Sequence, residues 1–214
     1  MRSKGHDEGE ILHGDVEQGA CVLLLTPSIH EATDEACHDL LTPADPDEEN
    51  VLWVTYTRSP DTCIRDWSSH AGERPGNARI VSVGETTRSA SSSVSTSADG
   101  GGPSSTNEVV ETLSNPSDLT GLGIKLSEIL KEWGENDNET VACFDSLTAL
   151  LQYADLQTVY KFLHVLTGRF DTADVTAHFH LDPDACDQQT VSTLTSLFDT
   201  VVEREDDEWV VRSR

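Results

Sequence analysis

The sequence predicts an α/β fold in three layers, with a mostly parallel sheet, helices on both faces and a C-terminal β-hairpin. Two observations predict it. Short apolar runs without polar alternation, such as residues 141–144, recur along the chain and are typical of strands buried on both faces. Amphipathic segments separate these runs, which is the pattern of βαβ units. A length of 214 residues is enough for one such domain with a substantial core.

The first half of the chain supports this interpretation. Residue Cys37 lies on the apolar inner face of its predicted helix, and Ser59 followed by Pro60 is a good N-cap and first helical residue. Gly72 follows the end of that helix. In chain order, the predicted elements are strand 21–25, helix 30–41, strand 51–56, helix 60–70 and strand 78–83.

The second half continues the alternation of helices and strands. Its helices show apolar residues at helical spacing, and the acidic turn 205–208 separates two apolar runs that predict a hairpin at one edge of the sheet. In chain order, the predicted elements are helix 118–133, strand 141–145, a short helix from residue 147, helix 155–170, strand 175–180, helix 188–197 and hairpin strands 198–204 and 209–212.

Two segments fall outside this pattern. Residues 1–13 are polar, and we expect a flexible tail before a single domain over 14–214. Residues 85–107 are rich in Ser, Thr and Gly with almost no apolar bulk, so burial cannot offset the entropy of ordering them. We expect a disordered insert there and not a domain boundary, because the parts on either side have too few strands to stand alone.

The charge of the chain restricts its partners. Lys and Arg total 14 against 39 Asp and Glu, which gives a net charge of −25. This charge repels phosphate, so the sequence excludes nucleic acid and anionic membranes as direct partners. An acidic, lysine-poor chain is typical of salt-accumulating archaea, where concentrated salt screens carboxylate repulsion. An ordinary acidic mesophilic protein is the alternative.

The cysteines and the hydropathy pattern indicate a cytoplasmic protein. The five cysteines form no CxxC pair, and Cys21 and Cys143 lie inside apolar strands, where a free thiol behaves as a small apolar side chain. This usage fits a reducing compartment without a disulfide framework. The sequence has neither an apolar run long enough to span a membrane nor a signal-peptide core, and we therefore predict cytoplasmic localisation.

The order of these parts resembles the RecA-like ATPases, in particular their single-domain KaiC/RadA-type branch, over about residues 14–212. Residues 141–146, ending in Asp145 and Ser146, resemble the Walker B strand of that family. Strand 21–25 occupies the place before the phosphate loop, and strand 51–56 is followed by Arg58-Ser59-Pro60 as in the family. The resemblance implies a RecA-like sheet and a nucleotide site at its carboxyl edge.

The residue types that a phosphate loop of that family requires are missing from this sequence. Such a loop needs glycines whose N–H groups surround a phosphate, a Lys for the β and γ oxygens, and a Ser or Thr for Mg²⁺. Residues 26–33 read Thr-Pro-Ser-Ile-His-Glu-Ala-Thr, with neither Gly nor Lys. Thr55, Tyr56 and Thr57 stand where the family places its catalytic carboxylate. A working ATPase is therefore not expected.

The residues that would still hold a nucleotide or its Mg²⁺ are Asp145, Ser146, Ser28 and Thr33. We read them as a vestigial site with no catalytic residue, and we expect no bound cofactor, with ATP–Mg²⁺ as the alternative. Ser146 is not a nucleophile candidate, because it lacks the Gly-x-Ser-x-Gly elbow.

A second candidate site lies at the end of the last long strand. His178 and His180 point the same way on a strand, and Asp182 follows at its end; all three are Zn²⁺ ligands by type, and we expect this edge to lie beside Asp145. The alternative is structural: one histidine packs in the core, Asp182 turns the chain and Asp187 caps the next helix.

The sequence thus predicts a catalytically inactive RecA-like domain that acts as a regulatory or protein-interaction module in a halophilic archaeon. Its expected partner is a protein, such as an active paralogue or a signalling protein, bound through the sheet edge. Two alternatives remain open: residual nucleotide binding without efficient hydrolysis, and a metal-binding protein or metal-dependent enzyme that uses His178, His180 and Asp182.

Overall fold

Nine strands form one sheet in the part of the chain that the computed structural model describes, namely residues 4–6, 13–27, 31–42, 45–84, 107–205 and 208–213. The strands are β1 (Lys4–His6), β2 (Cys21–Leu25), β3 (Glu49–Thr55), β4 (Asn77–Val83), β5 (Asn107–Leu113), β6 (Glu139–Asp145), β7 (Val175–Leu181), β8 (Thr200–Glu205) and β9 (Glu208–Ser213). The α-helices are α1 (Glu31–Leu40), α2 (Pro60–Ala71), α3 (Leu119–Trp133), α4 (Leu147–Leu150), α5 (Leu156–Thr172) and α6 (Gln188–Thr195). Short 3₁₀ helices are His13–Asp15, Pro46–Glu48 and Pro183–Ala185.

The sheet is mostly parallel, which confirms the predicted fold class. Its strand order is β1-β9-β8-β2-β7-β6-β3-β4-β5, and every pair from β8 to β5 in this order runs parallel. The predicted C-terminal hairpin is present and is formed by β8 and β9. Strand β8 pairs parallel with β2, and β9 alone runs antiparallel to its neighbours β8 and β1.

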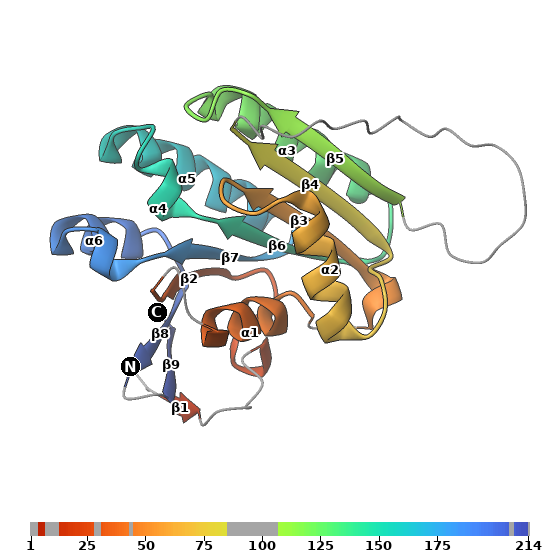
Figure 1. Cartoon of the computed structure of the whole chain (residues 1–214), viewed down its shortest axis with the longest axis horizontal. Coiled ribbons are helices and arrows are strands. Elements are labelled where there is room, and N and C mark those ends of the chain that lie inside the picture. The colour runs from red at the N-terminus through yellow and green to blue at the C-terminus, as the bar shows by residue number, and fades with distance from the viewer. Residues whose placement is uncertain are drawn as a thin grey trace, which may run out of the picture.

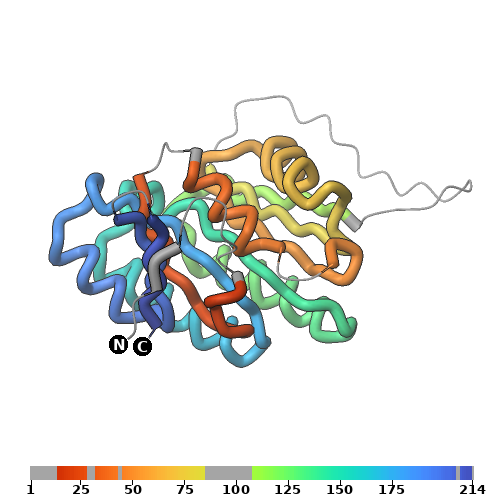
Figure 2. Tube along the Cα trace, turned by 90° about the horizontal axis from the view of Figure 1, so that it is seen from below, coloured from red at the N-terminus to blue at the C-terminus, as the bar shows by residue number. Residues whose placement is uncertain are grey.

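Helices cover both faces of the sheet (Figure 1). Because strand side chains alternate between faces, Phe144 and Phe179 point into the core under α3, α5 and α6. Their neighbours Cys143 and His178 point to the other face, where α1 and α2 pack. Figure 2 shows the same arrangement from a second direction. The central strands therefore carry two different chemical faces.

The helix boundaries follow from capping residues. Ser59 caps α2 by accepting a hydrogen bond from Thr62 N, and Gly72 ends this helix with φ of 85°, a conformation that favours glycine. Asp118 and Asp155 cap α3 and α5 in the same way. The helices predicted from residue 60, 118 and 155 therefore begin where the capping residues indicate.

Two strands were not expected from the sequence. Lys4–His6 pairs with β9, within the segment expected to be a tail. Strand β5 begins at Asn107, the last residue of the expected insert, and residues 85–106 lie outside the described residues. Among the described residues, strand β5 pairs with β4 alone. Its Val109 and Val110 are exposed, and it lacks the continuous apolar pattern of the central strands. None of the helices in the described ranges is both long enough and apolar enough to cross a bilayer.

Candidate metal centre

The carboxyl edge of the sheet has a cavity of about 240 Å³ between the ends of β2, β6 and β7. Five residues singled out from the sequence line it: Thr33, Asp145, Ser146, His180 and Asp182. The structure therefore places residues of both predicted sites at one edge, as expected for strands that end side by side. Ser28, the remaining residue of the predicted nucleotide site, lies outside the described residues.

The Asp145 carboxylate is held by residues that follow β3. Thr57 Oγ1 donates a 2.7 Å hydrogen bond to Asp145 Oδ2, and Arg58 Nε lies 3.5 Å from the same oxygen. The Arg58 guanidinium also pairs with Asp34 on α1. This network was not predicted. The network gives the Asp145 carboxylate a fixed cationic partner, Arg58. In a nucleotide site this carboxylate would instead be needed for Mg²⁺.

The hydroxyl groups of the predicted nucleotide site make structural hydrogen bonds. Ser146 caps α4, because its Oγ accepts a 3.1 Å hydrogen bond from Ala149 N. Thr33 Oγ1 donates a 3.3 Å hydrogen bond to Pro27 O. Both residues are buried, and both hydroxyls are used by the fold.

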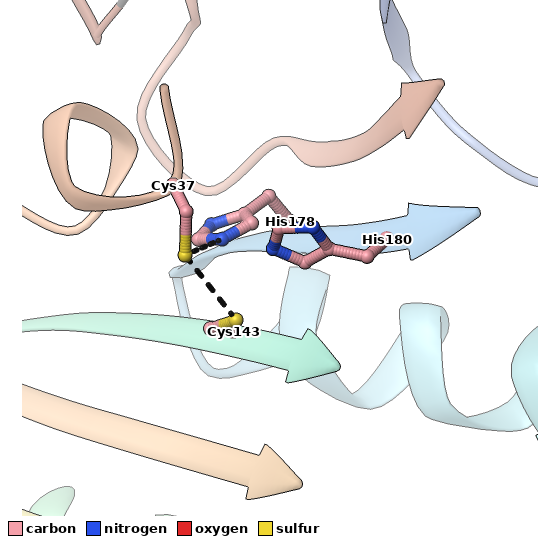
Figure 3. Close-up of side chains that lie close together, drawn as sticks. All are labelled: Cys37, Cys143, His178 and His180. Atoms are coloured by element: carbon pink, nitrogen blue, oxygen red, sulfur yellow. Dashed lines mark hydrogen bonds between the residues drawn. The ribbon is translucent and has the colours of Figure 1, made fainter. Parts of the chain in front are cut away.

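Directly beneath this edge, four side chains converge between α1 and the sheet (Figure 3). Cys37 comes from α1, Cys143 from β6, and His178 and His180 from β7. One ligand atom from each lies within 4.8 Å of all the others. Cys37 Sγ is 3.7 Å from Cys143 Sγ and 3.2 Å from His178 Nε2. We call these four residues the Cys₂His₂ cluster.

The topology explains why these residues meet. In the parallel β6–β7 pair Cys143 stands beside His178, so their side chains lie on the same face. His180 follows two residues later and therefore points to that face as well. Helix α1 covers it with an apolar stripe in which Cys37 faces the sheet. Each ligand is thus fixed by a regular element and not by a loop.

Burial controls the electrostatics of the cluster. Burial raises the pKa of the Cys143 thiol well above its ordinary value, and a hydrogen bond with Cys37 adds to this effect. Burial also lowers the pKa of His178 well below its ordinary value, and the charge of the neighbouring His180 lowers it further. Low-dielectric surroundings of this kind disfavour a charged thiolate or imidazolium that has no compensating partner.

The spacing of the cluster fits a tetrahedral metal ion. Zinc binds Cys sulfur at about 2.3 Å and His nitrogen at about 2.0–2.1 Å, and the edges of that tetrahedron are then about 3.3–3.8 Å long. The 3.7 Å separation of the sulfurs lies within this range, and the 3.2 Å separation of Cys37 Sγ and His178 Nε2 is slightly shorter than its lower end. The other ligand atoms lie within 4.8 Å of one another, so the side chains would have to move closer together to bind one ion.

The sequence identified half of this cluster. His178 and His180 were predicted as ligands from their alternate positions on one strand. Asp182 was predicted with them but lies outside the cluster, because its carboxylate accepts a hydrogen bond from Asp184 N and caps the short 3₁₀ helix. Asp187 caps α6, as the structural alternative stated.

Cys37 and Cys143 were missed as ligands. The available signal was that both cysteines lie at inward positions of their elements, but residues 37 and 143 are far apart in the sequence. A third thiol, Cys63, lines a small cavity of about 10 Å³ together with Cys37, Cys143 and His180. Cys63 is not one of the four converging residues, and burial raises its pKa to about 12.

Comparison with known proteins places the chain in a family. The chain belongs to a family of unknown function, DUF7504, whose family model matches residues 19–204. It is also similar to a solved structure from Pyrococcus horikoshii OT3, determined in a structural study, with a TM-score of 0.54 and 11% identity over 94% of this chain and 90% of that chain. At this identity the likeness supports the fold alone. No curated protein matches the chain.

Proposed function

We propose that this member of the DUF7504 family is a zinc-binding domain in which Cys37, Cys143, His178 and His180 hold one Zn²⁺ ion. The observation that supports the proposal is the convergence of four ligand atoms from three separate elements within 4.8 Å, all of them buried. His180 Nε2 is also a buried atom without a hydrogen-bond partner. Buried polar atoms are normally paired, and a metal ion would satisfy this one.

The ligand types favour zinc over other common ions. Two sulfurs and two nitrogens in a tetrahedral arrangement are typical of Zn²⁺, whereas Ca²⁺ and Mg²⁺ prefer six or more oxygen ligands. Two thiolates, two neutral imidazoles and a divalent ion also sum to zero net charge. A neutral complex is the form that a buried, low-dielectric position tolerates.

The proposed ion would have a structural role. A site with four protein ligands keeps no open position for substrate or water, unlike a catalytic zinc site. The ion would join Cys37 on α1 to Cys143 on β6 and to both histidines on β7. Helix α1 also carries Thr33, which lines the carboxyl-edge cavity, and Asp34, which pairs with Arg58. Zinc would therefore fix the position of the helix that borders this cavity.

We further propose that the domain performs no phosphoryl transfer and acts in regulation through a protein partner. The resemblance to RecA-like ATPases remains a prediction. Two features support the absence of turnover: residues 26–33 contain neither Gly nor Lys, and the Asp145 carboxylate is engaged by Thr57 and Arg58. Phosphoryl transfer depends on positioning and charge stabilisation, for which these residues provide no substitute.

Elemental analysis tests the zinc proposal. The full chain, produced with zinc in the medium and purified without chelators, is expected to contain about one zinc per chain, and Cys37→Ser and His178→Asn variants are expected to lose it. Cys63→Ala is the matched control, because it removes a neighbouring buried thiol that is not a ligand. Wild-type protein without zinc, or variants that retain it, would overturn the proposal.

The same preparations test the absence of phosphoryl transfer. Incubation with ATP and Mg²⁺ is expected to release phosphate at the same background rate from wild-type protein and from the Asp145→Asn variant. Phosphate release by the wild type that Asp145→Asn abolishes would show a working site at this carboxylate.

A further inference from the structure

The face of the sheet opposite the Cys₂His₂ cluster has an apolar groove between α3 and α5. These two helices pack side by side over the main core (Figure 1), and the groove between them has a volume of about 360 Å³. Ile124 and Val165 flank it, with 55% and 53% of their surface exposed. They are two of the five large apolar side chains that are exposed in the described part of the chain. Single exposed apolar residues scattered over a surface are common, but these two lie together in one groove.

The floor of the groove is shaped by a glycine and an aromatic ring. Gly123 belongs to α3 and has no side chain, so Phe162 of α5 and the Arg169 guanidinium come close to its backbone. A Cβ atom at position 123 would lie 3.8 Å from Phe162 Cε2, in ordinary van der Waals contact. The groove thus has no side chain at position 123 and has one exposed apolar residue on each helix, Ile124 and Val165, an arrangement that accepts a side chain from a helix laid across it.

The charge of the groove is opposite to that of the molecule. Its ten lining residues include Lys161 and Arg169 but no Asp or Glu, on a chain with 39 acidic and 14 basic residues. Arg169 is held in place, because its Nη1 donates a 2.9 Å hydrogen bond to Gly123 O and its guanidinium also contacts Ser127. Lys161 is exposed. The groove therefore carries a local charge of +2, whereas the net charge of the whole chain is −25.

This charge decides between possible occupants. Two copies of the chain that met groove to groove would bring like charges together, which disfavours a symmetric dimer through this face. An occupant with carboxylates beside its apolar residues would instead pair with Lys161 and Arg169. We propose that the groove between α3 and α5 binds an amphipathic helix of a partner protein whose polar positions are acidic. Its apolar residues would pack between Ile124 and Val165.

A helical peptide library provides the test. Its members have fixed Leu residues at positions i, i+3, i+4 and i+7 and a choice of Glu, Gln or Lys at the remaining positions. Peptides are selected on the full wild-type chain and counter-selected on the Ile124→Glu variant, and affinities are measured by fluorescence anisotropy. We expect the enriched peptides to be rich in Glu and to bind Lys161→Glu at least about tenfold more weakly, a loss of about 1.4 kcal/mol.

The controls keep the outcome decisive. Lys131→Glu reverses an exposed lysine of α3 that does not line the groove, and this variant is expected to bind as wild type does. Val165→Glu provides a second variant of the groove wall if Ile124→Glu fails to fold. Enrichment of neutral or basic peptides, equal losses in Lys161→Glu and Lys131→Glu, or the absence of any peptide that prefers wild type to the wall variants would overturn the proposal. None of these outcomes depends on zinc binding.

Discussion

Removal of zinc by a chelator is expected to lower the free energy of unfolding by about 4 kcal/mol, relative to protein in free Zn²⁺ at about a thousand times its dissociation constant. The reason is that the proposed ion would bind only the folded arrangement of Cys37, Cys143 and the two histidines. The four groups come from three elements and are far apart in an unfolded chain. Denaturant unfolding followed by tryptophan fluorescence, with and without chelator, measures the difference.

Two variants show whether this loss comes from the proposed ligands. Cys143→Ser is expected to unfold at the same denaturant concentration with and without chelator, because it has no site to lose. Cys63→Ala is expected to respond to the chelator as wild type does. A chelator effect of the same size in Cys143→Ser, or none in wild type, would contradict a stabilising site at this cluster.

Replacing Phe179 with Ala is expected to lower the free energy of unfolding by about 3–5 kcal/mol. Phe179 is fully buried, and its ring centroid lies 5.6 Å from that of Phe144 and 5.0 Å from that of Phe198. Its removal leaves a cavity at the centre of the main core. Because Phe179 points to the face opposite His178 and His180, the folded variant is expected to keep its zinc.

Guanidinium denaturation and elemental analysis of the same samples check both parts of this prediction. Tyr153→Ala is a suitable control, since Tyr153 is 54% exposed and its loss is expected to change the stability by less than about 1 kcal/mol. A loss below about 1 kcal/mol in Phe179→Ala would show that the aromatic cluster is not the centre of the core. Loss of zinc from folded Phe179→Ala would show that the two faces of β7 are not independent.

The alternation along β7 explains what the sequence could predict about the site. A period of two places His178 and His180 on one face, and this is a local property that can be read from consecutive residues. The buried strand that ends at Asp145 is local in the same sense. Both predictions depended only on neighbouring residues, and the structure places the residues accordingly.

The partners of the histidines could not be predicted in the same way. Cys143 meets His178 because β6 and β7 are neighbours in register, and Cys37 joins them because α1 packs over that pair. Strand order and helix packing depend on the whole fold and are not encoded by spacing along the chain. Asp182 was chosen instead because it is close in sequence, but its backbone turns away from the cluster into a 3₁₀ helix.

The elements at the edges of the sheet were harder to predict for a related reason. A central strand needs apolar residues on both faces. In the part of the chain that the structure describes, β5 is the last strand of the sheet on its side, and it tolerates Glu108 and Glu111 beside its valines. Strand β8 was predicted as part of a terminal hairpin. Its parallel pairing with β2 could not be predicted, because the sequence does not show that β2 and β8 are neighbours in the sheet. Edge strands therefore have a weaker pattern than the centre.

The most direct test of the zinc site is X-ray absorption spectroscopy at the zinc edge of the purified protein. We expect two sulfur ligands at about 2.3 Å and two imidazole nitrogens at about 2.0–2.1 Å in the wild type, and no zinc signal from Cys143→Ser, which has no site left to bind the ion. A wild-type spectrum with oxygen and nitrogen ligands only, or a Cys143→Ser sample that gives the same spectrum as the wild type, would contradict zinc binding by Cys37, Cys143, His178 and His180.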